Sequence, residues 1–215
     1  MKPNKTASNI RRINPLHPEP DILKETLQIL TDNGIVMAPT ETKYGLLTRI
    51  DSPGLVKKVY DIKNRPLSMP TAIFIRSFDE IYKFGVVNAA AKKMAERFFP
   101  GPMTLVVKAR TDYPAPIVID GKIGLRFSSS EIITQLLTQA DFNLTATSAN
   151  ISGENEPENI EEARKQFGDS INLYLDAGPL NGPSSTVVDC SGETYKILRE
   201  GAISNEDIKK SLEMN

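Results

Sequence analysis

Residues 144–153 read LTATSANISG, and this stretch decides how the rest of the sequence is interpreted. It begins with an apolar pattern that is typical of a strand and then changes to small residues that form hydrogen bonds. Such a run lets the backbone approach a ligand closely and offers hydroxyl, amide and N–H donors, as in a nest for phosphate oxygens or a base edge. The alternative is a capped turn into the next helix, because Ser and Asn are favoured caps. The residues of this stretch alone favour neither interpretation.

Helical and strand-like patterns alternate on both sides of this stretch. Leu23, Leu27 and Leu30 have helical spacing, Ser52–Pro53 is a typical helix start, and Ser77 with Glu80 has the spacing of a capping box. We expect helices at residues 21–33, 53–62, after 77, 88–98, 130–139, 158–167 and 204–213, and strands at 35–38, 45–50, 71–75, 104–109, 123–127, 142–147, 171–175, 185–189 and 195–199.

The order of these elements predicts an α/β fold with a mixed sheet. No helical pattern separates the strands at 104–109 and 123–127, and the last strands also follow one another directly, which a purely parallel sheet does not allow. We expect an N-terminal arm at residues 1–20, with room for a short edge strand, and a single domain at residues 21–215.

The composition excludes several kinds of site. The 215 residues include one cysteine, Cys190, and one histidine, His17, so an internal disulfide and a Cys/His zinc site are impossible and a Cys–His or Ser–His nucleophile is disfavoured. We expect no protein-held metal. No apolar run reaches membrane-spanning length, so we expect a cytoplasmic protein that does not bind membranes.

Four basic residues stand at the ends of predicted elements. Lys63 and Arg65 end a helix, and Arg126 and Arg199 each end a strand. Ligand crevices of open α/β sheets form at strand ends, and arginine suits two-point contact with phosphate or carboxylate. Because the net charge is −1, an anion site has to be built from a few such cations. A second interpretation remains open, in which Lys63 and Arg65 oppose the helix dipole and the two arginines form structural salt bridges.

Seven sequence blocks occur in the order seen in one known family. They are APTETKYGL (38–46), KNRP (63–66), FPGPMTLVVK (99–108), IGLRF (123–127), TSANISG (147–153), SSTVVD (184–189) and ILREGAI (197–203). In these blocks the chain resembles the YrdC-like family, whose best-known members are threonylcarbamoyl-AMP synthases of tRNA modification. The resemblance implies a mixed twisted sheet, flanking helices and a concave, positively lined cavity.

The resemblance also implies a reaction. L-threonine, bicarbonate and ATP would give threonylcarbamoyl-AMP and pyrophosphate, with Mg²⁺ bridging the phosphates and the product passing to the tRNA-modification machinery. The family's Lys-x-Arg and Ser-x-Asn signature falls on Lys63, Arg65, Ser148 and Asn150. The expected ATP-binding residues are Lys63, Arg65, Ser148, Asn150 and Arg199; the expected threonine-binding residues are Thr42, Arg126 and Ser185; and the expected catalytic residues are Lys63, Arg65 and Arg126.

Two departures from the family pattern concern the amino acid. Phe74 stands where many relatives have a histidine near the threonine substrate, and the usual Arg-x-Pro block is RFSSS (126–130) here. Because a phenyl ring offers no hydrogen bond to a hydroxyl, we expect a weaker preference for threonine over serine or valine.

Two other functions are compatible with the resemblance. One is an RNA-binding module without this activity, although the slightly acidic net charge and the lack of an aromatic stacking series disfavour it. The other is a divergent family enzyme that acts on another carbamoyl or adenylate substrate.

Overall fold

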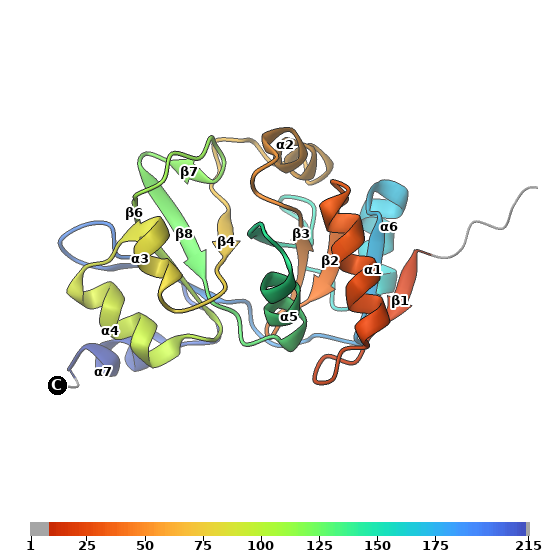
Figure 1. Ribbon diagram of the computed structural model, residues 1–215. Coiled ribbons are helices and arrows are strands. Elements are labelled where there is room, and N and C mark those ends of the chain that lie inside the picture. Colours follow the sequence, from red (N-terminus) through yellow and green to blue (C-terminus); the bar gives the residue numbers. More distant parts are fainter. Residues whose placement is uncertain (1–8, 214–215) are drawn as a thin grey trace, which may run out of the picture.

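The computed structural model describes residues 9–213 and consists of one twisted sheet with helices packed against it (Figure 1). The strands are β1 (Ile10–Arg12), β2 (Val36–Pro39), β3 (Tyr44–Leu47), β4 (Ala72–Phe74), β5 (Gly85–Val86), β6 (Met103–Ala109), β7 (Val118–Ile119), β8 (Lys122–Arg126), β9 (Leu144–Ser148), β10 (Leu173–Asp176), β11 (Thr186–Asp189) and β12 (Lys196–Arg199). The helices are α1 (Pro20–Thr31), α2 (Pro53–Ile62), α3 (Glu80–Phe84), α4 (Ala89–Phe98), α5 (Glu131–Gln139), α6 (Ile160–Phe167) and α7 (Asn205–Glu213), and a single 3-10 turn covers Gly168–Ser170.

The order across the sheet is β1-β10-β2-β3-β9-β4-β8-β6-β11-β12, with β5 paired to β6 and β7 paired to β8. Strand β2 is antiparallel to β3 but parallel to β10, and β4 is antiparallel to β9 but parallel to β8. The prediction of a mixed sheet flanked by helices is therefore confirmed.

Helices cover both faces of the half of the sheet that contains β2. Val36 and Ala38 lie in an apolar cluster with residues of α1 and α5, whereas Met37, between them, lies in a cluster with residues of α2 and α6. Successive side chains of a strand point to opposite faces. This half is thus a three-layer sandwich, which agrees with the almost wholly apolar sequence of the strand at residues 35–38.

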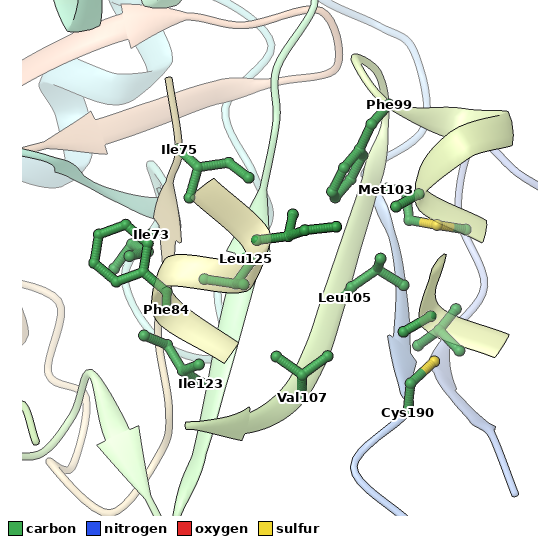
Figure 2. Packing of buried hydrophobic residues seen from close by; sticks show 14 of the residues in the cluster. Ile73, Ile75, Phe84, Phe99, Met103, Leu105, Val107, Ile123, Leu125 and Cys190 are labelled. Carbon is green, nitrogen blue, oxygen red and sulfur yellow. The ribbon is translucent and has the colours of Figure 1, made fainter. Parts of the chain in front are cut away.

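The other half of the sheet has a different arrangement. One face of β4, β8, β6 and β11 packs against α3, α4 and α7 through residues such as Ile73, Leu105 and Leu125 (Figure 2). The residues that alternate with them, including Phe74 and Arg126, point to the opposite face and line a cavity there. Alternate side chains of these strands therefore belong to the apolar core and to the cavity.

Local differences from the sequence predictions have identifiable causes. The strand predicted to reach residue 50 ends at Leu47, because the Thr48 N–H bonds the hydroxyl of Thr145, 3.1 Å away, instead of a backbone carbonyl. The predicted capping box does not form at α3, since the Glu80 carboxylate accepts hydrogen bonds from the Arg76 backbone N–H (2.9 Å) and guanidinium (3.1 Å). Bonds to a charged guanidinium are the stronger alternative.

The N-terminal arm expected at residues 1–20 is only partly described, because residues 1–8 lie outside the described range. Ile10–Arg12 forms the edge strand β1, parallel to β10. Within residues 9–213, no helix has both the length and the apolar character needed to cross a bilayer.

Candidate active site

A cavity of about 700 Å³ lies on the face of β4, β8, β6 and β11 that faces away from α3 and α4. Its lining residues belong to strands and loops, and none of those described belongs to a helix. Arg65, Arg126 and Arg199 line it together with Thr42, Ser148 and Ser185. The tertiary structure thus brings six separate sequence positions to one cavity of a volume suited to a small-molecule ligand.

Lys63 and Asn150 are the expected site residues that do not line the cavity. The Lys63 side chain is 1% exposed, and its Nζ donates to the carbonyl oxygens of Ser148 and Asn150, the latter at 2.7 Å. The Lys63 carbonyl in turn accepts the N–H of Ser152 at 2.7 Å. Lys63 therefore ties the end of α2 to the loop that follows β9.

The backbone at the end of α2 separates the two cations of the KNRP motif. Asn64 has φ +49°, in the left-handed region, so the chain turns sharply between Lys63 and Arg65. The Lys63 side chain therefore enters the protein, whereas Arg65 lines the cavity. Burial, aided by repulsion from Arg65 and opposed by attraction to Glu156, lowers the pKa of Lys63 to about 7.

The small-residue loop after β9 has most of its polar groups bound within the protein. The Ser148 hydroxyl donates to Asn150 Oδ1 at 2.5 Å, and Asn150 Nδ2 donates to the carbonyl of Glu154 at 2.8 Å. The N–H groups of Ile151 and Ser152 donate to Gln166 Oε1 and to the Lys63 carbonyl. The loop is therefore not the open nest of N–H donors considered above.

The alternative, a capped turn into the next helix, is not what the loop forms either. Helix α6 begins only at Ile160, and its cap is Asn159, whose side chain accepts from Glu162 N–H. The small residues instead permit close contacts within the loop, and Gly153 adopts φ +88°, which residues with a side chain rarely adopt. Ser148 remains the residue that presents this loop to the cavity.

Arg199 and Ser185 form one unit on the opposite wall. Arg199 Nε and Nη2 donate to the Ser185 carbonyl at 3.1 and 2.9 Å, and Nη2 also reaches the Ser185 hydroxyl at 3.1 Å. The chain after β12 runs so close to the chain before β11 that a Cβ on Gly201 would lie 2.1 Å from the Ser184 carbonyl oxygen. Only glycine fits there, which explains the Gly of the ILREGAI block.

The guanidinium of Arg199 experiences competing influences. The residue as a whole is exposed, but its head lies against Ser185 at the cavity wall. Desolvation, together with repulsion by Arg126 and Arg65, lowers the pKa of Arg199 below its ordinary value, and attraction by Glu156 opposes this. Arg199 is thus close enough to both of the other arginines to be influenced by their charge, as an anion site requires.

Arg126 is the most enclosed of these arginines, with 8% of its surface exposed. Its Nη2 donates to Thr42 Oγ1 at 2.7 Å and to Glu41 Oε1 at 2.9 Å, and its Cζ lies 5.3 Å from the centre of the Phe74 ring. Phe74, which is 1% exposed, also packs into the apolar cluster beneath α1 and α5. Thr42 and Phe74, both expected at the amino-acid end of the site, therefore contact the same guanidinium.

Arg65 is held at the cavity mouth. Its Nη2 donates to the Pro70 carbonyl at 2.7 Å, and its Cζ lies 5.4 Å from the Tyr60 ring centre. The Nε atoms of Arg65 and Arg126 and the hydroxyl of Thr147 are buried and have no hydrogen-bond partner in the structure, and all three residues line the cavity. Unpaired donors of this kind are costly, which is consistent with a site that a polar ligand completes.

The sequence interpretation missed two carboxylates. Glu41 pairs with Arg126, and Glu156 accepts a hydrogen bond from Ser184 Oγ at 2.5 Å and lines the cavity. Glu41 lies inside the APTETKYGL block, so an acidic residue within a conspicuous polar motif was the available signal. Glu156 lies in the loop after the small-residue run, where no pattern distinguishes it from its acidic neighbours.

The two residues that could have supplied a conventional nucleophile or base lie elsewhere. Cys190 belongs to the apolar cluster under α4, and burial, aided by Asp189, raises the pKa of its thiol to about 12. His17 is exposed in the connection between β1 and α1. The cavity can therefore bind, orient and stabilise anions, but neither of these side chains can act in it.

Comparison with known proteins gives a consistent result. The family model Sua5/YciO/YrdC, described as telomere recombination, matches residues 28–201. A putative threonylcarbamoyl-AMP synthase of Methanocaldococcus jannaschii is 35% identical over 170 residues, which cover 79% of this chain and 80% of that protein. A threonylcarbamoyl-AMP synthase of Bacillus subtilis is 30% identical over 87% of this chain, and this chain spans about half of it, 55%.

A solved structure is also similar. The structure of Sua5 of Pyrococcus abyssi complexed with L-threonine superposes with a TM-score of 0.86 at 29% identity, over 95% of this chain and 61% of that one. The arrangement of sheet and helices described above is thus that of a protein solved with a bound amino acid.

Proposed function

Because this chain belongs to the Sua5/YciO/YrdC family, we propose that it is an L-threonylcarbamoyl-AMP synthase, which forms threonylcarbamoyl-AMP and pyrophosphate from L-threonine, bicarbonate and ATP. One observation carries the proposal beyond family membership. A single cavity has Arg65, Ser148 and Arg199 on its walls together with the Thr42–Arg126 pair, so a polyanion and an amino acid can be bound side by side.

The triphosphate of ATP is assigned to Arg65 and Arg199, with Ser148 beside it. Both guanidiniums line the cavity, and each uses part of its fork on a backbone carbonyl, which fixes its orientation. Arginine retains its charge in such a setting and suits phosphate oxygens. Lys63 and Asn150 contribute by holding the loop that carries Ser148, which differs from the direct contact expected from the sequence.

The amino acid is assigned to Arg126, Thr42 and Ser185. Arg126 would hold the carboxylate of threonine, or the carbamate that forms from the threonine amine and bicarbonate. The hydroxyl groups of Thr42 and Ser185 would orient the substrate. Ser185 is buried and its hydroxyl is 3.3 Å from that of Thr104. Phe74, against the Arg126 guanidinium, contributes shape but no hydrogen bond to this end of the cavity.

The chemical step needs alignment and charge stabilisation more than a protein nucleophile. Threonine and bicarbonate give the carbamate with loss of water. A carbamate oxygen then bonds to the α-phosphorus of ATP, and the bond from that phosphorus to the β-phosphate oxygen breaks, so that pyrophosphate leaves with the electron pair. Arg65 and Arg199 would stabilise the charge on the transferred and leaving phosphates, and Arg126 would orient the carbamate.

Magnesium would enter with the nucleotide. The described residues contain no group of three or more His, Cys, Asp or Glu side chains that could hold a metal. Such a lining suits Mg²⁺ better than an ion that needs several protein ligands, because Mg²⁺ usually binds through substrate phosphates, waters and one or two carboxylates. Glu156, one of the carboxylates that line the cavity, lies close enough to Arg199 to attract it and would be available to the ion.

The decisive experiment measures pyrophosphate release with threonine, bicarbonate and ATP omitted in turn. Dependence on all three, with loss of turnover in Arg65→Ala and normal turnover in Lys57→Ala on the neighbouring helix surface, would support the proposal. Turnover with another amine would indicate the divergent enzyme, and RNA binding without turnover would indicate the binding module. We propose that the product then passes to the tRNA-modification machinery. We therefore also propose that the protein works in the cytoplasm.

A further inference from the structure

Glu41 stands behind the amino-acid end of the cavity and does not line it. We propose, building on the function above, that Glu41 is a positioning residue that holds Arg126 in the orientation required to bind the substrate carboxylate. The geometry that carries this is a carboxylate whose two oxygens are both committed, Oε1 to Arg126 Nη2 at 2.9 Å and Oε2 to the Ser128 hydroxyl.

The burial of the pair makes Glu41 necessary to Arg126. The side chains of Arg126 and Glu41 are 10% and 13% exposed, so neither charge is well solvated. Removing one member of a buried pair leaves the other as an uncompensated charge, which is strongly unfavourable. Without the carboxylate, Arg126 would be a buried cation beside Arg199, whose pKa it already helps to lower.

The same contacts engage one nitrogen of the Arg126 guanidinium and leave another without a partner. Both protons of Nη2 are engaged, one by Glu41 and one by Thr42 Oγ1 at 2.7 Å. Nε is buried and has no partner in the structure. Glu41 and Thr42 therefore anchor one edge of the guanidinium, so that the rest of it is left for the ligand.

The anchor is itself braced by the loop before β3 and by the start of α5. Thr40 Oγ1 donates to the Lys43 carbonyl at 2.7 Å and accepts the Thr42 N–H at 3.1 Å, which fixes the turn that carries Glu41. Ser128, the other partner of Glu41, accepts the Ser130 N–H at 3.1 Å. A site held to a fraction of an ångström needs such supporting contacts.

The test uses Glu41→Gln, which keeps an acceptor for Arg126 but loses the charge and the acceptor for Ser128. The KM for threonine should rise about tenfold or more, the effect of losing one charge-assisted hydrogen bond, while the KM for ATP changes little. Glu158→Gln, an exposed carboxylate in the loop before α6, is the matched control and should leave both values unchanged. Glu41→Asp, which retains the charge, should recover part of the loss.

A double-mutant cycle separates positioning from direct contact. In an Arg126→Met background, adding Glu41→Gln should raise the KM for threonine no further, because Glu41 acts only through Arg126. Additive effects would overturn the inference, as would an unchanged KM for threonine in Glu41→Gln when the unaltered protein turns over normally.

A second measurement does not depend on the reaction. The Nε–H signal of Arg126 in a nitrogen-15 NMR spectrum, assigned by its disappearance in Arg126→Lys, should be sharp in the unaltered protein and broadened or shifted in Glu41→Gln. An unchanged signal would overturn the positioning role. Absence of threonine-dependent turnover in the unaltered protein would instead refute the proposed function, and the NMR result would still decide the role of Glu41.

Discussion

Replacing Lys63 with methionine should change how the stability of this protein depends on pH. Lys63 as a whole is 1% exposed, and its amino group donates to two loop carbonyls. The substitution keeps most of the buried aliphatic stem and removes this amino group. We expect the free energy of unfolding of the unaltered protein to rise relative to that of Lys63→Met as the pH increases from about 7 to about 9. Urea denaturation of both proteins across this pH range measures the difference.

The sign follows from the direction of the pKa shift. Burial lowers the pKa of Lys63 from 10.5 to about 7 in the folded protein. Between these two pH values the folded protein has released a proton that the unfolded chain still binds, so unfolding takes up a proton and becomes harder as pH rises. The gain begins near the folded pKa and is complete above the unfolded pKa.

The magnitude is set by the width of that range. Each pH unit over which one proton is taken up on unfolding is worth about 1.4 kcal/mol, and Lys63 is only half deprotonated at pH 7. The difference between the unaltered protein and Lys63→Met should therefore grow by about 2 kcal/mol from pH 7 to pH 9. All other titrating groups are common to both proteins and cancel.

Lys57→Met is the matched control, because Lys57 lies on the same helix, has 58% of its side chain exposed and is paired with Asp61. Its stability curve should run parallel to that of the unaltered protein. If the curve of Lys63→Met is also parallel, Lys63 keeps its charge over the whole range and the two carbonyl contacts outweigh desolvation. That result would refute the reasoning.

Amide exchange of residues 148–153 should be faster in Lys63→Met, since the loop loses its bridge to α2.

Three further substitutions test the cavity walls. Arg199→Lys keeps the charge but loses the two-point contact with the Ser185 carbonyl. Turnover should therefore fall at least about tenfold, while the melting temperature stays close to that of the unaltered protein. Normal turnover would mean that a point charge suffices. Ser148→Val fills the wall and removes the hydroxyl that binds Asn150, so ATP binding measured by calorimetry should be lost, and tight binding would exclude the loop from the nucleotide site. Phe74→His should raise the preference for threonine over serine and valine in pyrophosphate release, whereas strict threonine specificity in the unaltered protein would show that Phe74 only packs.

The sequence by itself determined the elements and the region of the site. Apolar spacing and caps located the helices and most strands, because these signals act over a few residues and need no distant partner. The absence of a helical pattern between residues 109 and 123 was enough to predict a mixed sheet. The ordered blocks, from APTETKYGL to ILREGAI, identified the family and named six of the residues that line the cavity.

Only the tertiary structure decided which way the charged side chains point. Lys63 and Arg65 are two residues apart and look equivalent in the sequence, yet the left-handed conformation of Asn64 sends one into the protein and leaves the other at the cavity. Glu41 acquires its role from Arg126, 85 positions further along the chain. Such pairings depend on which strands become neighbours, and strand order is set by the burial of whole sheet faces, which no local pattern of residues records.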